Sequence, residues 1–372
     1  MVRSFLPVGQ GAFYCECFEG NKRNIHVVYD CGSSTSVKYV EKEIKNNFQE
    51  GDIIDALFIS HLDKDHVNGI PFLLSYCKVK RIYFPLISSA NKKILKIYYS
   101  INGISGFVAD FLENPRSAIG SLGIDYYPEL IQIDEAGTEG MEQGFNGLDS
   151  LRRRSGDNIS GDLNISGTSG EERYSEWLYI PFNFRQKERI DMLMKKLAII
   201  YKRPITEDEI EELWRINAAG DRDKIREAYK EVPDNFNTNS MTLFSGEIDK
   251  LFRQYANTCY SKYCFRCRDF TPSGCLYTGD YNASGKYEWR QLENAYTYYW
   301  EHIGCVQIPH HGSRHGFNPA FLDMDAYFVI SCGYANQYRH PHSSVMKSFL
   351  LRFIFPHIVT EHVGSAAFLV VE

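Results

Sequence analysis

The chain has 372 residues, of which 44% are hydrophobic and 24% charged, and its formal net charge at pH 7 is -6. This composition is typical of a globular protein with a sizeable core, and it excludes a generally basic nucleic-acid-binding surface, so any nucleic-acid contact must be local. No stretch reaches the roughly 20 apolar residues of a membrane span, and the N-terminal segment has no signal-peptide pattern. We therefore expect a cytoplasmic protein without a membrane partner.

The N-terminal part of the chain predicts a series of β-strands. The apolar runs 12–18 (AFYCECF) and 25–32 (IHVVYDCG) are separated by the turn EGNKRN, which is the pattern of a hairpin. The run 55–61 (DALFISH) predicts a buried strand, and 81–87 (RIYFPLI) predicts another. The strand at 55–61 leads directly into SHLDKDH at 60–66. We expect these polar side chains on the loop at the strand's carboxyl end, where α/β folds usually hold their chemistry.

Two segments in the middle of the chain differ from this pattern. Residues 137–170 are rich in Gly and Ser and have little hydrophobic periodicity, which predicts a flexible insert. From about 181 to 236 the apolar residues follow helical spacing, and TEDE at 206–209 is a capping box that opens a helix. We expect one domain over residues 1–372 that contains these two inserts, and we interpret the apolar stripe of the helical insert as core packing.

Three later strands lead to residues that can bind metal ions. The apolar runs GCLYTGD, CVQIPHHGSRHG and AYFVISCGYANQYRHPH are each followed by polar side chains. The residues concerned are Asp280, the adjacent His310 and His311, and His340. Taken singly, an Asp or His in such a place is more often a turn or cap residue. Their joint appearance at successive strand ends favours a shared site.

The SHLDKDH loop adds His61, Asp63, Asp65 and His66 to these candidates. A pair of divalent ions requires several His and Asp ligands and one carboxylate that bridges the ions, and such pairs activate water and hold a phosphoryl or acyl group. Adjacent Asp65 and His66 point in different directions from one loop, so they can serve a different ion from His61 and Asp63. Asp280 is the natural bridge between the two ions.

With these motifs the chain resembles the metallo-β-lactamase-fold hydrolases, and within them the branch typified by the C-terminal domain of the DNA-uptake channel ComEC. The resemblance rests on VGQGAF followed by YDCG, on SHLDKDHVNG, on NTNSMTLF followed by LYTGDY, and on IPHHGSRHG followed by NQYRHPH. These motifs span residues 8–342. The resemblance implies an α/β fold, a four-layer αββα sandwich in which two mixed sheets lie face to face, with helices outside and metals at one edge. The two inserts are then expected to cover this edge.

The same resemblance implies a role for each candidate residue. The implied metal ligands are His61 and Asp63 for one ion, Asp65 and His66 for the other, Asp280 as the bridge, and one histidine of the 310/311 pair to complete the second site. Either member of the pair could be the ligand, and we favour His310, which directly follows the strand. His311 is then left for substrate or proton handling, and His340 lies at the rim, placed to bind a phosphate or a leaving group. We expect Asp65, His311 and His340 to carry catalysis.

The sequence departs from the superfamily pattern at the first metal site. Asp63 stands where most of the superfamily has a second histidine, and a further ligand usually comes from between the opening loop and the bridging Asp. No histidine occurs from residue 67 to 301, so Asn239 or Ser240 is the candidate for an oxygen contact, directly or through a water. Because an oxygen-rich site favours manganese or magnesium over zinc, we expect two divalent ions, Zn²⁺ or Mn²⁺, with Mg²⁺ as a further candidate.

Three functions of different kinds fit these residues. The leading hypothesis is a metal-dependent phosphodiesterase, in particular a nuclease with DNA or RNA as substrate, in which a metal-bound hydroxide attacks phosphorus. A second hypothesis is a hydrolase of a small ester, lactone or phosphorylcholine-type diester, which a deep small pocket would favour. The third is a non-catalytic metal-binding sensor or interaction module. The crowded carboxylates argue against it, since a scaffold without turnover has no physical need for their repulsion.

Two smaller patterns leave their alternatives open. LRRRSG at 151–156 and NKKILK at 91–96 are local basic runs that suit a nucleic-acid groove, and solvated surface charge explains each of them equally well. Cys264 and Cys267 form a CxxC pair, which is a weak indication of a structural zinc site. Most of the other cysteines lie in strand-like runs and are expected to be buried, reduced thiols.

Overall fold

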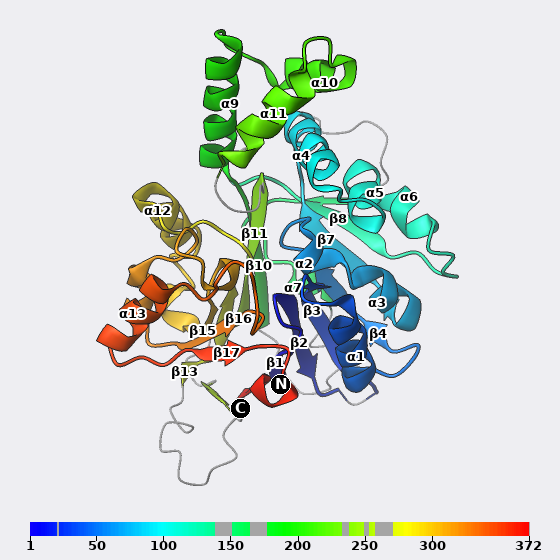
Figure 1. Ribbon diagram of the computed structural model, residues 1–372. Coiled ribbons are helices and arrows are strands. Elements are labelled where there is room, and N and C mark those ends of the chain that lie inside the picture. The colour runs from blue at the N-terminus through cyan, green and yellow to red at the C-terminus, as the bar shows by residue number, and fades with distance from the viewer. Residues whose placement is uncertain are drawn as a thin grey trace.

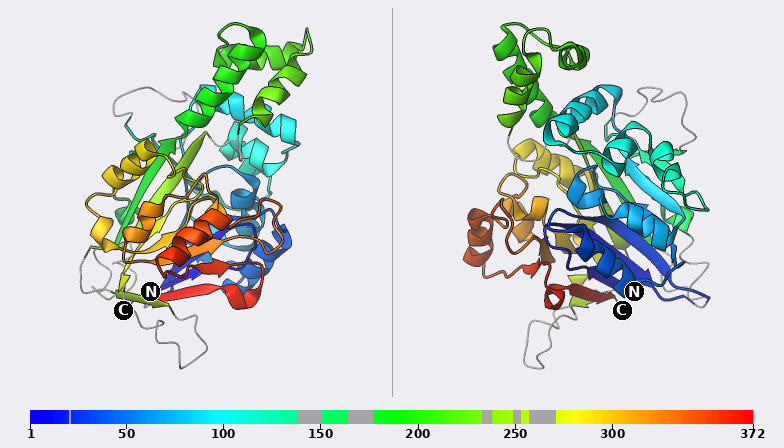
Figure 2. Two further views of the ribbon diagram at one scale, coloured as in Figure 1. Left: turned by 60° about the vertical axis from the view of Figure 1, so that its left-hand side comes forward. Right: turned by 45° about the vertical axis from the view of Figure 1, so that its right-hand side comes forward.

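The computed structural model describes residues 1–20, 22–137, 151–163, 177–232, 238–248, 253–256 and 271–371. Two large β-sheets lie at its centre, with helices on their outer faces (Figure 1, Figure 2). Residues 138–150 and 164–170 of the expected flexible insert lie outside the described residues, as does the Cys264/Cys267 pair. Within the described part of the chain, no helix has the length and apolarity needed to cross a membrane.

Within the described residues, the first sheet has ten strands and contains the predicted N-terminal hairpin. In order across the sheet they are β13 (Thr271–Pro272), β12 (Arg253–Ala256), β18 (Ala367–Val371), β1 (Val2–Phe5), β2 (Gly11–Phe18), β3 (Ile25–Ser33), β5 (Ala56–Phe58), β7 (Arg81–Pro85), β8 (Glu129–Ile133) and β9 (Leu151–Arg153). Pairing is antiparallel from β13 to β3 and parallel from β3 to β9. The hairpin and the strands expected near 55–61 and 81–87 are confirmed.

The second sheet, in the part of the chain that the structure describes, has six strands and brings the later motifs to one edge. In order they are β10 (Trp177–Arg185), β11 (Asn239–Glu247), β14 (Gly274–Tyr277), β15 (Ile303–Gln307), β16 (Tyr327–Ser331) and β17 (His357–Val359). The strands β14 to β17 are parallel, so their carboxyl ends lie at the same edge. A small separate sheet pairs β4 (Ile53–Ile54) with β6 (Lys78–Val79).

Helices cover the outer faces of both sheets. Those that follow strands of the first sheet are α1 (Val37–Asn47), α2 (Lys64–Val67), α3 (Ile70–Tyr76), α4 (Ser89–Asn102), α5 (Phe107–Glu113), α6 (Pro115–Gly120) and α7 (Ser160–Leu163). A helical group follows β10 and comprises α9 (Lys187–Tyr201), α10 (Glu207–Ile216) and α11 (Asp221–Lys230). The second sheet is covered by α12 (Lys286–Ala295) and α13 (Ser343–Leu351) (Figure 1). Short 3-10 turns occur at Trp300–His302, His310–Gly312, Pro319–Asp323 and Val363–Ser365.

Three hydrophobic cores separate the layers. The middle core joins the two sheets, where the rings of Tyr14 and Tyr29 stack on Tyr277 with centroids 5.9 and 4.9 Å apart. One outer core packs the first sheet against α1, α3, α4 and α5, and the other packs the second sheet against α12 and α13. The order helix, sheet, sheet, helix is the predicted four-layer αββα sandwich, and this expectation is confirmed.

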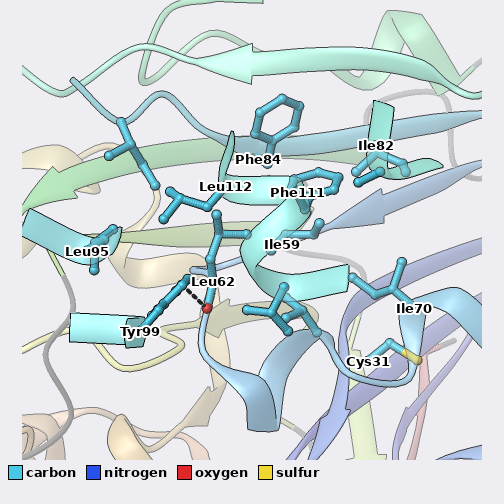
Figure 3. Packing of buried hydrophobic residues seen from close by; sticks show 14 of the residues in the cluster. Cys31, Ile59, Leu62, Ile70, Ile82, Phe84, Leu95, Tyr99, Phe111 and Leu112 are labelled. Carbon is cyan, nitrogen blue, oxygen red and sulfur yellow. Dashed lines mark hydrogen bonds between the residues drawn. The ribbon is translucent and has the colours of Figure 1, made fainter. Parts of the chain in front are cut away.

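The outer core of the first sheet supports the loop that follows β5. Leu95 and Tyr99 lie one helical turn apart on α4, and both face this core together with Ile59 and Leu62 (Figure 3). The hydroxyl of Tyr99 donates a hydrogen bond to the carbonyl of Leu62, in the middle of the SHLDKDH loop. Helix α4 therefore fixes the loop from the side opposite the second sheet.

The segment from about 181 to 236 starts as a strand, and its helices begin later than expected. Residues 177–185 pair with β11 along their whole length, from Trp177 opposite Glu247 to Arg185 opposite Asn239. This pairing buries most of the strand, so helical structure begins only at Lys187. The predicted capping box is present at the start of α10. Within 137–170, residues 151–153 form β9 and 160–163 form α7.

The group α9 to α11 shares its core with α4. Apolar side chains of these helices belong to the same cluster as Leu95. The hydroxyl of Tyr229 donates to the carbonyl of Ile94 at 2.8 Å, and Lys93 forms an ion pair with Asp208 at 2.6 Å. The interpretation of the apolar stripe as core packing is therefore confirmed.

A buried polar network ties the two sheets together. Arg3 on β1 is fully buried, and its Nε donates to Oε1 of Glu16 on β2 at 2.8 Å. The hydroxyls of Tyr277 and Tyr179, on the second sheet, donate to the same carboxylate at 2.9 and 2.6 Å. Ser245 on β11 donates at 2.6 Å. Since each sheet carries part of the candidate site, this network helps to set the relative position of its two halves.

Six cysteines in the described part of the chain are buried free thiols, as expected. They are Cys15, Cys31, Cys77, Cys275, Cys305 and Cys332.

Candidate metal centre

The predicted metal-binding side chains come from both sheets and meet at one edge of the sandwich. The loop after β5 of the first sheet carries the residues from 61 to 66, and the loops after β14 and β15 of the second sheet carry the others. All are polar or ionisable, yet none is more than 5% exposed. They are His61, Asp63, Asp65, His66, Asp280, His310 and His311.

The loop after β5 packs closely on the first hairpin. The backbone amide of His66 donates to the carbonyl of Asp63 at 3.0 Å at the start of α2. A Cβ atom on Gly32, in the YDCG motif, would lie 2.6 Å from the His66 nitrogen, which is far inside van der Waals contact. Glycine at this position therefore permits the loop to lie directly against β3.

Asp30 holds the two histidines of this loop. Its Oδ2 lies 2.7 Å from Nδ1 of His66 and accepts a hydrogen bond from the Ser60 hydroxyl at 2.6 Å. The Ser60 hydroxyl, with its proton directed at Asp30, in turn lies 2.8 Å from Nδ1 of His61 and is placed to accept from it. We assign the Nδ1 protons of both histidines to these bonds. Both Nε2 atoms are then left as lone-pair donors towards the centre.

His311 is oriented in the same way from the second sheet. Its Nδ1 lies 2.8 Å from the carbonyl oxygen of Ser331 at the end of β16, and a carbonyl can only accept, so Nδ1 carries the proton. Its Nε2 lies 3.3 Å from Oδ2 of Asp65. Donor atoms of Asp65, His66 and His311 all lie within 4.8 Å of one another, which places these residues in one group.

Asp280 lies between this group and a second one. Its Oδ1 is 3.3 Å from Nε2 of His66, and its Oδ2 is 3.6 Å from Nε2 of His61 and 3.6 Å from Nε2 of His310. Donor atoms of His61, His66 and Asp280 lie within 4.8 Å of one another. Asp63 joins from the side of His61, with 3.8 Å between its Oδ2 and the imidazole Nε2. The two oxygens of Asp280 therefore face different sets of side chains.

The turn before Asp280 is fixed by Gln307. Its Oε1 accepts from the backbone amides of Thr278 and Gly279, both at 2.8 Å. Gly279 has a φ of 53°, a conformation that glycine adopts without strain. The side chain of Gln307 thus anchors the end of β14 to β15.

The two adjacent histidines face different parts of the centre, and the arrangement differs from the one we favoured. His311, and not His310, lies beside Asp65 and His66, while His310 lies on the His61 side of Asp280. Both residues have left-handed backbone conformations, with φ of 51° and 55°. Their rings are 6.1 Å apart and inclined by 70°. Proximity to the strand end does not reveal this turn.

His340 lies next to both histidines of the pair, and Asn239 is engaged elsewhere. The His340 ring centroid is 5.6 Å from that of His310 and 6.3 Å from that of His311. The amide of Asn239 takes part in a chain of amides, donating to Asn183 at 3.0 Å and accepting from Asn91 at 3.2 Å. Neighbouring Ser240 is fully buried.

Several atoms at the centre have no hydrogen-bond partner among the described residues. They are Nε2 of His61, His66 and His311 and both carboxylate oxygens of Asp63 and Asp280. A buried polar atom left in this state costs about 1–3 kcal/mol. Imidazole nitrogens and carboxylate oxygens together form a donor set for divalent zinc or manganese, so these residues fit a metal centre.

The pKa values of the buried carboxylates also indicate a metal centre. Burial, with the nearby charges of Asp65 and Asp280, raises the pKa of Asp63 to about 8. Burial also opposes ionisation of Asp280, but the surrounding imidazoles, His310 first among them, hold its pKa well below the ordinary value. Crowded acids of this kind are stabilised by a bound cation.

Sequence reasoning missed the residues that orient the ligands. Asp30 contacts the ligand His66, and Gln307 accepts from the backbone that precedes Asp280, but each is distant in sequence from the segment that it contacts. The YDCG motif contains Asp30, and an acidic residue within an apolar strand is the available signal. For Gln307 we find no signal in the sequence.

Comparison with known proteins finds one family model that matches part of the chain. Residues 19–146 match the model of the metallo-beta-lactamase superfamily, and this range includes the whole SHLDKDH loop. Among solved structures, the chain is similar to MEM-A1, a subclass B3 metallo-beta-lactamase isolated from a soil metagenome library. Identity is 13%, with 83% of this chain and 81% of that chain covered, and the TM-score is 0.29. No curated protein matches.

The similarity to the metallo-beta-lactamase superfamily thus covers residues 19–146. This superfamily comprises in general metal-dependent hydrolases, and its fold binds divalent metals, typically zinc. The His and Asp groups described above are placed to bind such ions.

Substitution of Asp30 tests the orienting role of this residue. Asp30→Asn keeps the shape of the side chain but replaces one acceptor oxygen by an NH₂ group. Oδ2 accepts from His66 and the Ser60 hydroxyl, and Oδ1 accepts from the Ser60 backbone amide at 2.7 Å, so these three bonds cannot all persist. We expect the Kd for Mn²⁺ to rise about 10- to 100-fold, the usual effect of losing such a support. Equilibrium dialysis with metal analysis measures it. Exposed Asp110→Asn is the matched control, and an equal Kd in the two variants would contradict the assignment.

Proposed function

We propose that the chain is a dinuclear metal-dependent phosphodiesterase. The observation that carries the proposal is the position of Asp280, whose two oxygens face different groups of imidazoles. A carboxylate in this position can hold two ions at a fixed spacing. His61, Asp63 and His310 would hold one ion and Asp65, His66 and His311 the other, with Asp280 between the two groups.

The protein's own residues supply the orientation and charge that hydrolysis needs. Bound divalent ions provide an activated water and stabilise negative charge on the reacting group. Asp30 and the Ser331 carbonyl accept hydrogen bonds from Nδ1 of His66 and His311, and these bonds orient the two rings. His340 lies beyond His310 and His311, where its imidazole can donate a proton to a leaving oxygen or a hydrogen bond to a phosphate.

Two arguments favour a phosphodiester over other hydrolysable groups. The motif resemblance to the ComEC-type branch, with Asp63 in place of a histidine, supports hydrolysis of a nucleic-acid phosphodiester. An additional carboxylate also makes the site oxygen-rich, which suits the manganese or magnesium that phosphoryl transfer often uses.

The basic runs support a short substrate more than a long duplex. Arg152 is paired with Asp134 at 2.7 Å, and Arg153 with Asp162 at 3.2 Å. In the other run, Lys93 is paired with Asp208 and Lys96 with Glu113. Since the affinity of a protein for a nucleic-acid backbone comes largely from Lys and Arg charges that neutralise phosphates, paired side chains contribute less to it. We therefore propose a nucleotide-type diester as substrate, with single-stranded ends of DNA or RNA before duplexes.

A panel of substrates tests this function. The purified protein is incubated with bis(p-nitrophenyl) phosphate, single-stranded and duplex DNA, RNA, p-nitrophenyl acetate and a lactone, each with Mn²⁺, Mg²⁺ or Zn²⁺. We expect metal-dependent cleavage of the diester and of single-stranded nucleic acid. Cleavage of the acetate or the lactone alone would support the small-ester hydrolase, and binding of two ions without turnover on the whole panel would support the sensor.

Alanine variants of the adjacent histidines test the ligand assignment. His311→Ala removes a donor from the group of Asp65 and His66, and His310→Ala removes one from the group of His61 and Asp63. We expect each variant to weaken a different ion, so that Mn²⁺ titrations followed by electron paramagnetic resonance lose different components. The coupled two-ion signal should be absent from both. Loss of the same component in both variants, or an unchanged titration in either, would contradict the assignment.

A further inference from the structure

A polar cavity of about 340 Å³ lies against the segment that leads to His340. It is formed where the segments after β16 and β17 approach the ends of β2 and β3. Its lining residues are Gln10, Ser34, Thr35, Ala335, Asn336, Gln337, Tyr338 and Glu361. This lining, which falls wholly within the described chain, contains amides, hydroxyls, one carboxylate and one aromatic ring, and neither Lys nor Arg. Such a surface suits an uncharged planar group with hydrogen-bond donors and acceptors, and it does not suit a phosphate.

A column of stacked rings connects this cavity with the metal centre. The ring of Tyr338 stacks on His340 with a centroid distance of 5.7 Å and an angle of 22°. His340 in turn lies parallel to His311, at 6.3 Å and 22°. These separations are within the range of favourable aromatic contacts. Tyr338 is 46% exposed and forms the outer end of the column, so part of its surface remains available to another ring.

The loop that carries Tyr338 is held in place before any substrate binds. The Asn336 amide donates to the carbonyls of Gly333 and His340, both at 2.7 Å, and accepts from the His340 backbone amide at 2.8 Å. The amide of Gly333 donates to Oε1 of Gln10 at 3.3 Å, which ties the loop to the first sheet. A preformed loop loses little entropy when a ligand binds.

We propose that this cavity is a nucleoside subsite, in which Tyr338 stacks on the base attached to the scissile phosphodiester. This inference rests on the proposed phosphodiesterase function and specifies its substrate class. The phosphate lies at the metal centre, the base lies over Tyr338, and the surrounding amides and hydroxyls bind base and sugar edges. Base stacking on an aromatic side chain contributes through any base, so the subsite selects nucleosides without strong preference among them.

Two esters that share a leaving group test the subsite. Thymidine 5′-(p-nitrophenyl phosphate) and methyl p-nitrophenyl phosphate differ only in the nucleoside. We expect the wild type to prefer the thymidine ester, and Tyr338→Ala to lower the ratio of the two kcat/KM values about tenfold or more, mainly through KM. Tyr338→Phe should retain the preference. Tyr298→Ala, at an 88% exposed tyrosine before β15, is the matched control and should leave the ratio unchanged.

A binding measurement separates failure of this subsite from failure of the proposed function. Thymidine 5′-monophosphate is titrated into the wild type, Tyr338→Ala and Tyr298→Ala by calorimetry, which needs no turnover. If neither ester is cleaved but Tyr338→Ala alone weakens binding of thymidine 5′-monophosphate about tenfold, the subsite is supported and the phosphodiesterase assignment is contradicted. If both esters are cleaved with a ratio that Tyr338→Ala does not change, the subsite is overturned and the function stands. Equal binding by all three proteins, or no binding by any, also overturns the subsite.

Discussion

Replacing Asp280 by asparagine should reduce bound metal below two ions per chain and lower phosphodiester hydrolysis by about three orders of magnitude or more. A bridging carboxylate neutralises both ions and fixes their spacing, whereas an asparagine amide is uncharged and offers a single good donor oxygen. Asparagine has nearly the volume of aspartate, so the substitution leaves no cavity in this fully buried position. Metal analysis after gel filtration and steady-state kinetics on bis(p-nitrophenyl) phosphate measure the two effects.

The control for Asp280→Asn is the same change at Asp125, an exposed residue before β8. It should leave both metal content and turnover at the wild-type level. Circular dichroism of both variants should match the wild type. Two ions per chain and near-normal turnover in Asp280→Asn would show that Asp280 is not the bridge, and the match of the segments from YTGD to RHPH with the family would then have to be redrawn.

Arg3→Met should destabilise the fold by about 3–5 kcal/mol, the usual cost of removing one partner of a buried ion pair. Methionine fills much of the space of the arginine stem, but Glu16 then remains buried as a carboxylate without its counter-charge. Hydroxyls of Tyr179, Tyr277 and Ser245 still donate to it and are insufficient to neutralise it. Urea denaturation at pH 7 measures the change in the free energy of unfolding.

Glu16→Gln in the Arg3→Met background is the matched test of this explanation. The neutral amide removes the unpaired charge and keeps an acceptor for the tyrosine hydroxyls, so the double variant should regain part of the lost stability. If Arg3→Met unfolds at the wild-type urea concentration, the pair contributes nothing to the contact between the sheets. If the double variant is less stable than Arg3→Met, the loss comes from packing and not from charge.

The fold and the members of the cluster could be predicted because their signals are local. Each ligand-bearing loop directly follows an apolar strand, and strand ends bring such loops together. His61 to His66, Asp280 and the 310/311 pair were all found in this way, and all lie within the same buried cluster. The apolar runs that predict the strands and the capping box at Thr206 are equally local patterns.

The sequence does not predict which of His310 and His311 lies beside Asp65, because this depends on backbone dihedral angles. Two successive left-handed residues turn the chain so that the second histidine, and not the first, reaches Asp65. Nor could the sequence indicate that Asp30 would hold His66, since the two residues are 36 positions apart and meet only when β3 and β5 pair.

The role of the two basic runs also could not be predicted from the sequence. A run of arginines has the same sequence whether it lines a groove or is paired with acids. Lys93 meets Asp208 only because α10 packs on α4, and Arg153 meets Asp162 across the turn between β9 and α7. Only the folded chain distinguishes these alternatives.

The most direct test of a dinuclear centre is anomalous diffraction from crystals grown with Mn²⁺. We expect two peaks in the anomalous difference map, one among Asp65, His66 and His311 and the other beside His61 and Asp63, with the carboxylate of Asp280 between them. A single peak that is not in contact with Asp280, or no peak at saturating Mn²⁺, would contradict the dinuclear centre on which the proposed phosphodiesterase depends.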